Sequence, residues 1–506
     1  MKPSSELFKL VKSLSKSEKR FFKLSSSLQS GDKNYLKIFD FIEKQRIYDE
    51  EALKEAYKGE RFIKHLPSEK NHLYKLILKS LRSFYSDQTV SSLLKQEIKN
   101  VEILYNKALF KECEKFVARA KAIAQDYERF YYWFELLSWE KKLLEEAYES
   151  GDFNVDLNAL IKEESMVIAK LRNLAEYQII YSKINFIFRS GGFARNAKER
   201  AMVNEIADYH LIKGKKTAIS TRAAVICYYI KGVCAATNRD YENAQVFFNK
   251  TRTILDDYPK LREDNGHRYL VTLSYLGRCN LEKKEYDKAE SIIKEMRLLS
   301  AEKGFNSLDL EVKIFTYSYN LELRTFHKKG DFESAYNLID EIENKQEGFG
   351  DKVNKENEVI FQYNKAYSCF GIGEYKKALT HLNLVLNDNE QRLRQDIYGF
   401  ARVFNLILHY EMENYEFLEY LIKSASRYIS KQERDMELEL TVIKSLRKLA
   451  KSNSVNEKRL VFEDLKVKME SFLLDENENV VTEYFHIFAW VDSKLNNISF
   501  MEAVKK

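Results

Sequence analysis

A short pattern recurs along most of the chain and limits the folds that it can adopt. Each copy has a turn residue such as Gly, Asp or Asn, then an aromatic residue, then a small or apolar residue three positions later. The aromatic positions are Phe110, Phe153, Phe193, Tyr241, Tyr286, Phe332, Tyr375 and Tyr415. Successive copies are 40 to 48 residues apart. That spacing suits a hairpin of two helices, each of about four turns, with short connections.

Each part of the pattern has a physical role in such a hairpin. A glycine in the turn adopts the left-handed conformation that ends the first helix, and an Asp after it caps the second. The aromatic side chain inserts between the two helices, and the small residue lets them approach. Gly232 and Gly277 fall in the middle of expected first helices, where glycine costs roughly 1 kcal/mol relative to alanine. We therefore expect close contact between helices at both glycines.

Composition excludes the strand-rich and disordered classes. The 506 residues include only three prolines and 16 glycines, and both residue types break helices. Hydrophobic residues make up 44% of the chain, which is enough to build a core. A chain of this length exceeds one compact core and is expected to form domains or a repeat array. We predict an all-α protein with a helical module over residues 1–90, about eight hairpins over 91–428 and capping helices over 429–506.

The sequence also predicts where the protein resides. No apolar run approaches the roughly 18 residues that a membrane-spanning helix needs. The first residues lead into an amphipathic segment and not into the apolar core of a secretory signal, so a cytoplasmic protein is expected. The five cysteines are scattered and odd in number, which does not resemble a disulfide framework. Cys227 and Cys234 are expected to pack as small buried side chains.

The repeat resembles the tetratricopeptide family. The segment from Tyr363 to Ala378 is a good match to one unit, and Leu276-Gly277 matches the Leu-Gly of the family's first helix. The family unit has about 34 residues, so the longer copies here imply extended helices and connections. The resemblance is strong over about 220–425 and weak over 95–220. It implies a right-handed superhelix whose first helices line a concave groove for a protein or peptide.

The two ends of the chain show a second resemblance. The block Leu14-Ser15-Lys16-Ser17-Glu18-Lys19-Arg20-Phe21-Phe22-Lys23 and the ending Phe488-Ala489-Trp490-Val491-Asp492-Ser493-Lys494 are similar to those of uncharacterised bacterial repeat proteins. That group implies no established activity. Near the end, Val481, Tyr484, Phe485, Phe488, Val491 and Leu495 form an apolar stripe at helical spacing, which predicts one terminal capping helix.

Under the first resemblance, seven polar or aromatic side chains face the groove. Tyrosine and arginine are typical of binding surfaces because they bury much area and keep a polar group. The expected set is Tyr229, Arg278, Asn320, Arg324, Tyr363, Tyr367 and Tyr410. Several of these side chains have an alternative role in packing between neighbouring helices; the two roles weigh evenly for Tyr363 and Tyr367, whereas Arg324 favours the groove. The first hypothesis is therefore a scaffold or adaptor that binds a protein or peptide and catalyses no reaction.

Charge sets the N-terminal region apart. Residues 1–100 hold 21 Lys and Arg against 13 Asp and Glu, a net charge of +8, whereas the whole chain carries +6. Lys75, Lys79 and Arg82 occupy one face of an expected helix that runs to about Tyr85. Because basic side chains neutralise phosphates, a nucleic-acid-binding regulator is the alternative hypothesis. A solvated helix face is the plainer interpretation, and the connection before this helix is longer than a helix-turn-helix needs.

No pattern of residues points to catalysis. The eight histidines are isolated, and none has a second histidine four positions away. A phosphate-binding loop is missing, and Gly371-Ile372-Gly373 is better explained as a hairpin turn than as a dinucleotide fingerprint. The sequence therefore names no catalytic residue, no metal ligand and no cofactor.

Overall fold

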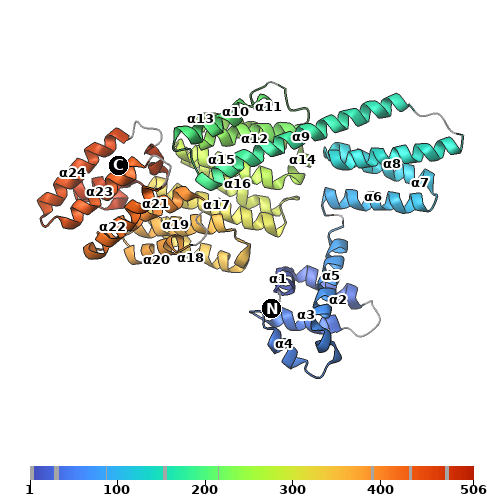
Figure 1. Ribbon diagram of the computed structural model, residues 1–506, viewed down its shortest axis with the longest axis horizontal. Coiled ribbons are helices and arrows are strands. Elements are labelled where there is room, and N and C mark those ends of the chain that lie inside the picture. Colours follow the sequence, from blue (N-terminus) through green and yellow to red (C-terminus); the bar gives the residue numbers. More distant parts are fainter. Residues whose placement is uncertain are drawn as a thin grey trace. The chain divides into compact units, whose positions relative to one another are not determined.

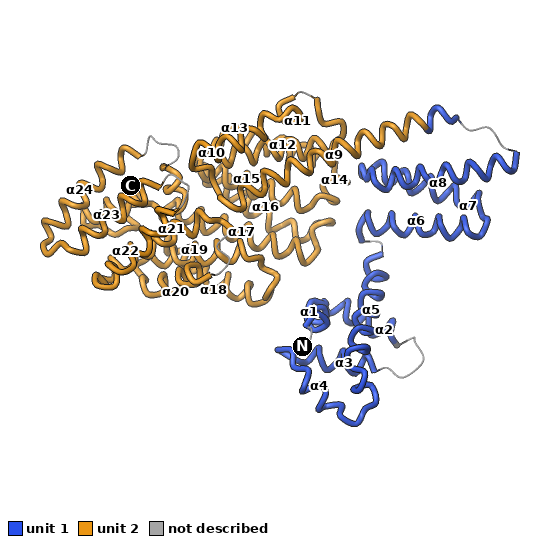
Figure 2. The backbone as a smooth tube through the Cα atoms, viewed as in Figure 1, with its two compact units in different colours: residues 1–160 blue, residues 161–506 orange. Residues whose placement is uncertain are grey.

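The structure is a computed structural model that describes residues 5–27, 34–86, 88–151, 156–214, 216–388, 393–431, 436–472 and 478–506. These residues form helices and no strands (Figure 1), which confirms the all-α class. The chain divides into two compact units, residues 1–160 and residues 161–506 (Figure 2). The module boundary expected at residue 90 lies inside the first of them.

The first unit begins with five helices that share one apolar core. They are α1 (Glu6–Ser13), α2 (Lys16–Ser27), α3 (Asn34–Lys44), α4 (Glu50–Ala56) and α5 (Leu66–Phe84), with the 3-10 helix η1 (Arg61–His65) before α5. Phe22, Phe39 and Ile77 are at most 1% exposed in this core. A capping box starts α2, because the Glu18 N–H donates to Ser15 Oγ at 3.2 Å and the Ser15 N–H donates to Glu18 Oε2 at 2.6 Å.

Three more helices complete the first unit, and each packs against the next. They are α6 (Val90–Asn106), α7 (Phe110–Asp126) and α8 (Phe130–Glu149). Phe110, expected as the first aromatic of the repeat, begins α7, and Cys113 three residues later is fully buried.

The second unit consists of helices joined by short connections. Its helices are α9 (Leu157–Gly191, which starts at the end of the first unit), α10 (Ala197–Asp208), α11 (His210–Lys213), α12 (Thr221–Thr237), α13 (Tyr241–Asp257), α14 (Pro259–Asp264), α15 (Gly266–Glu282), α16 (Tyr286–Leu298), η2 (Leu299–Ala301), α17 (Leu308–Lys329), α18 (Phe332–Phe349), η3 (Gly350–Lys352), α19 (Lys355–Gly371), α20 (Tyr375–Leu386), α21 (Gln395–Glu411), α22 (Tyr415–Ile429), α23 (Glu437–Lys451), α24 (Val455–Phe472), η4 (Glu478–Glu483), α25 (Ile487–Asn496) and α26 (Phe500–Lys505). From α12 to α24 the longer helices pack in consecutive pairs, and from α15 on the first helix of a pair also packs on the first helix of the next. The right-handed superhelix stays a prediction.

The repeat aromatics mark the start of second helices. Phe110, Tyr241, Tyr286, Phe332, Tyr375 and Tyr415 are the first residues of α7, α13, α16, α18, α20 and α22. The turn residue two positions before the aromatic has a positive φ. It is a glycine at Gly330 and Gly373, and it is another residue at positions 239, 284 and 413. Phe153 lies outside the described residues. The pattern therefore predicts helix starts whether or not the turn holds a glycine.

Phe193 is the exception among the described aromatics, because no helix starts there. α9 ends at Gly191, Gly192 has a φ of +76°, and α10 begins only at Ala197. The Phe193 side chain, 2% exposed, packs instead against the rings of Phe188 and Tyr484. The turn pattern is present, but here the aromatic enters the centre of the unit.

The predicted close contacts are confirmed at both mid-helix glycines. A Cβ added to Gly232 would lie 2.7 Å from the Phe248 ring, and one added to Gly277 would lie 2.3 Å from Leu321 Cδ2. The small repeat residues Ala244, Ala289, Ala335 and Ala378 are fully buried. All five cysteines are free and buried, as expected for Cys227 and Cys234. Within the described residues, no helix is long and apolar enough to cross a membrane.

The prediction of a terminal helix over the apolar stripe holds for Phe488, Val491 and Leu495, which lie in α25, and is wrong for the upstream half. η4 ends at Glu483 and α25 begins at Ile487, so the backbone turns between them. Tyr484 and Phe485, 8% and 1% exposed, are buried in the largest core cluster from this connection. The segment that carries the stripe is helical at its two ends and turns in between. Its aromatic side chains fill space between several helices, whereas a single helix would present them along one face.

Candidate functional site

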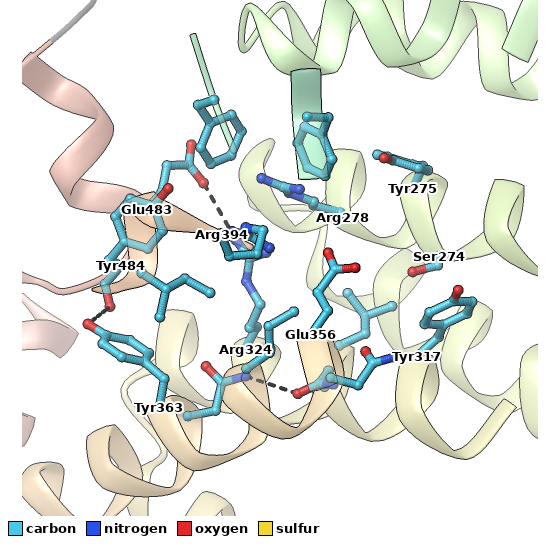
Figure 3. Close-up of a pocket in the computed structure, with 18 of the residues that line it drawn as sticks. Ser274, Tyr275, Arg278, Tyr317, Arg324, Glu356, Tyr363, Arg394, Glu483 and Tyr484 are labelled. Atoms are coloured by element: carbon cyan, nitrogen blue, oxygen red, sulfur yellow. Dashed lines mark hydrogen bonds and ion pairs between the residues drawn. The ribbon is translucent and has the colours of Figure 1, made fainter. Parts of the chain in front are cut away.

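A cavity of about 210 Å³ lies inside the second unit (Figure 3). We call it the central cavity. Its walls come from the end of α9 with Phe193, from one face each of α15, α17 and α19, and from residues 482–486 near the C-terminus. Polar and aromatic side chains dominate this lining. Segments far apart in the sequence converge on this space.

Helical periodicity explains why these side chains share the cavity. On α15 the lining residues are His267, Val271, Ser274, Tyr275 and Arg278, and on α17 they include Tyr317, Asn320, Leu321, Arg324 and Lys328. Steps of three and four residues keep a side chain on one face of a helix. The opposite faces of the same helices are also buried, with Leu270, Leu273 and Leu323 in the cores. These first helices therefore carry an apolar face and a separate polar and aromatic face.

The chain's own residues 478–486, here called the C-terminal segment, close one side of the central cavity. The Tyr363 hydroxyl donates to the Tyr484 carbonyl oxygen at 3.2 Å. The Tyr367 oxygen accepts from the His486 N–H at 3.1 Å and lies 2.5 Å from His486 Nδ1. Phe485 packs among Tyr367, Phe370 and other rings. The contacts engage backbone groups as well as side chains.

Glu483 of this segment lies in a concentration of positive charge. Its carboxylate accepts from Tyr241 Oη at 2.7 Å and pairs with Arg239 Nε at 3.2 Å and Arg324 Nη2 at 3.5 Å. Burial alone would raise the pKa of Glu483, but the nearby cations Lys328, Arg239, Arg278 and Arg324 lower it to about 2. Glu483 is therefore ionised throughout the physiological pH range.

Two further arginines of the lining are fully paired. Arg189 forms an ion pair with Glu356, and its Nε donates to Asn185 at 3.1 Å. Arg394 donates to the Asp396 carboxylate from Nε at 3.0 Å and from Nη2 at 2.7 Å. The Tyr484 hydroxyl donates to the same carboxylate. These contacts hold the end of α9, the start of α21 and the C-terminal segment in place around the cavity.

Arg278 differs from these arginines because no carboxylate contacts it. Among the described residues, it makes no hydrogen bond or ion pair, and its Nε is buried without a partner. The guanidinium carbon lies 4.4 Å from the centre of the Phe193 ring, close enough for a cation–π attraction. Figure 3 shows the side chain at the cavity beside Tyr275 and above Glu356. Arg278 therefore brings to the lining a guanidinium without a direct partner, on which Glu483 and Glu282 act only at longer range.

Hydroxyl groups add unsatisfied donors to the same lining. Ser274, Tyr275 and Tyr317 have no hydrogen-bond partner for their hydroxyls in the described part of the chain. Burial raises the pKa of Tyr317 to about 12, with Arg189 opposing the shift and Glu356 adding to it. It likewise raises the pKa of Tyr275. Both phenols are protonated at neutral pH and are ready to donate.

The buried histidines of the lining are neutral. Burial, and the charges of His486 and Arg324, lower the pKa of His327 to about 3. Burial and Lys328 lower the pKa of His486 to about 3. No group of three or more potential metal ligands occurs within the described ranges. The arrangement is suited to holding a ligand by charge and hydrogen bonds.

Six of the seven residues predicted for the groove line the central cavity, namely Tyr229, Arg278, Asn320, Arg324, Tyr363 and Tyr367. Tyr410 does not, because its ring packs against Phe462, Tyr415 and Trp490. Tyr363, Tyr367 and Arg324 contact the chain's own C-terminal segment. In the first unit, Lys75, Lys79 and Arg82 are all exposed on α5, and no ion pair reaches them within the described residues.

Sequence reasoning missed several lining residues. Ser274, Tyr275 and Tyr317 were within reach, because they lie three or four positions from Arg278 and Asn320 on the predicted first helices. Arg189, Arg394 and Glu483 carry no such indication. They lie at the end of α9, before α21 and in the C-terminal segment, and only the tertiary fold brings them together.

Comparison with known proteins adds no identification. The chain matches no protein-family model, and it has no significant match among curated proteins.

Proposed function

We propose that this chain is a non-enzymatic scaffold or adaptor that binds a protein or peptide partner along the polar and aromatic faces of α15, α17 and α19. The proposal includes the tetratricopeptide-like character of the hairpins, whose first helices would line a concave groove. It also includes a cytoplasmic location.

The observation that carries this proposal is the binding of the C-terminal segment to the same faces. Tyr363 and Tyr367 form hydrogen bonds to the backbone of Tyr484 and His486, and a cationic cluster holds the side chain of Glu483. Backbone hydrogen bonds supply affinity for any extended peptide, and side-chain pockets supply selectivity. A surface that holds one peptide segment of its own chain has the chemistry to hold a segment of a partner.

A peptide-display experiment tests the proposal without knowledge of the partner. The full-length chain is immobilised and exposed to a library of random linear peptides, and enriched peptides are resynthesised for measurement of Kd. We expect enriched peptides to bind the unaltered protein and to lose about tenfold or more in affinity with Tyr317→Ala, because one aromatic contact is worth about this much.

The matched control is Tyr420→Ala. Tyr420 is 69% exposed on α22 and does not line the cavity, so its removal is expected to leave the Kd unchanged. Absence of enrichment, or equal loss in both variants, would overturn the proposal.

A second candidate function is supported by the basic face of α5. Lys75, Lys79 and Arg82 are exposed and unpaired within the described residues, while Leu73 and Ile77 on the opposite face are buried. We propose as the alternative that the first unit contacts nucleic acid through this face. Such contacts depend steeply on salt, because each phosphate neutralised releases counterions.

A gel shift of the full chain with mixed duplex DNA fragments at low salt tests the alternative. We expect a shift that weakens as salt rises and that the triple variant Lys75→Ala, Lys79→Ala, Arg82→Ala removes. The control removes the same charge from ion-paired positions, with Lys19→Ala, Lys23→Ala and Lys37→Ala. A shift of equal strength in both triple variants, or none in the unaltered protein, would reject this candidate.

A further inference from the structure

The charges around the central cavity do not balance. Its lining includes five cationic side chains, Arg189, Arg278, Arg324, Lys328 and Arg394, and two carboxylates, Glu356 and Glu483, which leaves a net charge of +3. Two acidic groups behind the lining reduce the excess. Asp396 pairs with Arg394, and Glu282 accepts from Arg324 at 2.9 Å and from Lys328 at 2.8 Å. Arg239, also behind the lining, pairs with Glu483 at 3.2 Å. Six cations then stand against four carboxylates, and the cluster keeps a net charge of +2.

Among these cations, Arg278 is the one that no carboxylate of the described residues contacts directly. Every other arginine of the lining has a carboxylate within 3.5 Å or an ion pair with one, whereas Arg278 contacts only the rings of Phe188 and Phe193. Arg278 is partly buried and its Nε is fully so, and withdrawing a charge from water without a partner costs free energy. A fold that keeps an arginine in this state at a cavity is expected to satisfy it with something that enters the cavity.

The groups next to Arg278 also favour an anionic ligand in the cavity. The hydroxyls of Ser274, Tyr275 and Tyr317 have no partner in the described part of the chain, and the phenols are protonated donors. A guanidinium with convergent hydroxyl donors matches the oxygen atoms of a carboxylate or phosphate. Of the two lining carboxylates, Glu356 pairs with Arg189 and Glu483 pairs with Arg239 and Arg324, so neither forms an ion pair with Arg278.

The size and walls of the cavity define the rest of the guest. A cavity needs about 10–15 Å³ to hold one water molecule. The central cavity, at about 210 Å³, is therefore larger than a bare ion with its water molecules needs. The volume is below the roughly 300–1,000 Å³ of a site for a drug-sized ligand. Phe188, Tyr275 and Tyr229 present ring surfaces to the space. A compact guest with one anionic group and an apolar or aromatic body fits both features.

The C-terminal segment is a fixed wall of this cavity and not its guest. Phe485 is 1% exposed and packs against Phe370, Phe404 and Phe500 in the core. Glu478 at the other end accepts from the N–H groups of Glu437 and Leu438 at 3.0 and 2.8 Å, at the start of α23. Removal of the segment would expose that core. The cavity beside it is open while the segment is in place.

We propose that the central cavity is a binding site for a small organic oxyanion, a carboxylate or phosphate whose head group pairs with Arg278 and whose apolar or aromatic body packs on the rings of the lining. The hydroxyls of Ser274, Tyr275 and Tyr317 orient the head group. The site goes beyond the proposed partner binding and needs no protein partner to be occupied.

Calorimetric titration of the full chain with three compounds tests the charge requirement. Benzoate is a phenyl ring with a carboxylate, and phenyl phosphate is a phenyl ring with a phosphate. Benzamide is the neutral analogue of benzoate. We expect at least one of the two anions to bind and benzamide to bind about tenfold or more weakly, since a hydrogen bond to a charged group accounts for that difference. The stronger anion identifies the head group. Binding of neither anion, or equal binding of benzamide, would overturn the proposal.

Variants of the lining test whether Arg278 is the group responsible. Arg278→Met retains length and removes charge, and we expect it to abolish the preference for the anion over benzamide. The matched control Arg252→Met removes an arginine of α13 that pairs with Glu295 away from the cavity and should leave both affinities unchanged. Tyr317→Phe removes one hydroxyl with almost no change in packing and is expected to weaken the anion by about threefold or more. If Arg278→Met and Tyr317→Phe both retain full affinity in folded protein, the site is not the one described.

Discussion

Ion pairs on the surface of helices α1–α5 differ from ion pairs in the interior of the second unit. In α1–α5, Lys23 pairs with Asp40 at 2.8 Å while the two side chains are 42% and 50% exposed. In the second unit, Arg195 forms a bidentate pair with Glu439 at 2.6 and 3.1 Å, with exposures of 1% and 0%. The first kind of pair is surrounded by water, and the second has replaced water entirely.

The difference separates two uses of charge. Exposed pairs contribute about 0–1 kcal/mol and are screened by salt. Buried pairs roughly offset their own desolvation, but removing one partner leaves a charge that nothing satisfies. In the second unit such pairs join segments far apart in sequence, as Arg195 before α10 joins Glu439 on α23. Such a pair holds together the two segments that it joins, and breaking it on one side is costly.

The largest effect is expected from breaking the buried pair on one side only. Arg195→Met leaves Glu439 without a cation, and we predict a loss of about 3–5 kcal/mol in the free energy of unfolding. Chemical denaturation monitored by circular dichroism measures it. The double variant Arg195→Met, Glu439→Leu should recover most of the loss, because no unpaired charge is left.

Lys23→Met provides the comparison from the other region and should cost less than about 1 kcal/mol. The contrast between the two regions fails if Arg195→Met and Lys23→Met destabilise the protein equally.

The next effect depends on pH. The pKa of Glu483 falls from 4.5 to about 2 in the folded chain, so its ionised form stabilises the fold above the unfolded pKa. This contribution, about 3 kcal/mol by proton linkage, is lost as the pH falls from about 4.5 towards 2. We predict that Glu483→Gln is less stable than the unaltered protein at pH 6 and that the difference shrinks at pH 3, measured by urea unfolding.

Glu43 is the matched acidic residue of the first unit, because Lys19 and Lys23 also lower its pKa while its side chain is 29% exposed. The Glu43→Gln variant is expected to show a small difference at both pH values. A Glu483→Gln difference that is constant with pH would show that the cationic cluster does not act through the charge of this carboxylate.

A smaller effect on stability is expected at Gly192, where a left-handed backbone lies next to a buried carboxylate. Gly192 has a φ of +76°, and an added Cβ would lie 2.1 Å from Asp396 Oδ2, which accepts from Arg394. Gly373 has a φ of +86° but has nothing within 4 Å of an added Cβ. Left-handed backbone alone costs alanine about 1 kcal/mol, and crowding adds about 1–3 kcal/mol. Gly192→Ala should therefore lower the melting temperature clearly more than Gly373→Ala, and equal shifts would contradict the contact with Asp396.

The contrast between these two glycines also shows what the sequence predicts. Gly373 belongs to a local turn followed by Tyr375, and the pattern of turn, aromatic and small residue correctly predicts the start of α20. The same pattern at Gly192 does not predict a helix start at Phe193, because the space that this ring fills is formed by Tyr484 and Phe188. Local physics determines the hairpins, and distant packing determines the exception.

The residues of the candidate site likewise fall into a group that the sequence predicts and a group that it does not. Arg278, Asn320 and Arg324 were predictable because they follow helical periodicity on the first helices of the repeats. Glu483 and Arg394 were not, because they come from connections whose position depends on the rest of the unit. Even for the predicted residues, sequence did not distinguish Arg324, which pairs within the chain, from Arg278, which does not. That distinction requires the three-dimensional arrangement of carboxylates.

The smallest effect on stability is expected from the basic face of α5. Lys75 and Lys79 are like charges four residues apart on one helix, an arrangement that destabilises a helix by about 0.2–0.5 kcal/mol. The triple variant Lys75→Ala, Lys79→Ala, Arg82→Ala should therefore leave the melting temperature unchanged or raise it slightly, as calorimetry would show. A clear loss of stability would mean that these side chains serve the fold of the first unit. An unchanged or raised melting temperature would show that α5 keeps three charges that contribute nothing to folding, as a surface for an external phosphate requires.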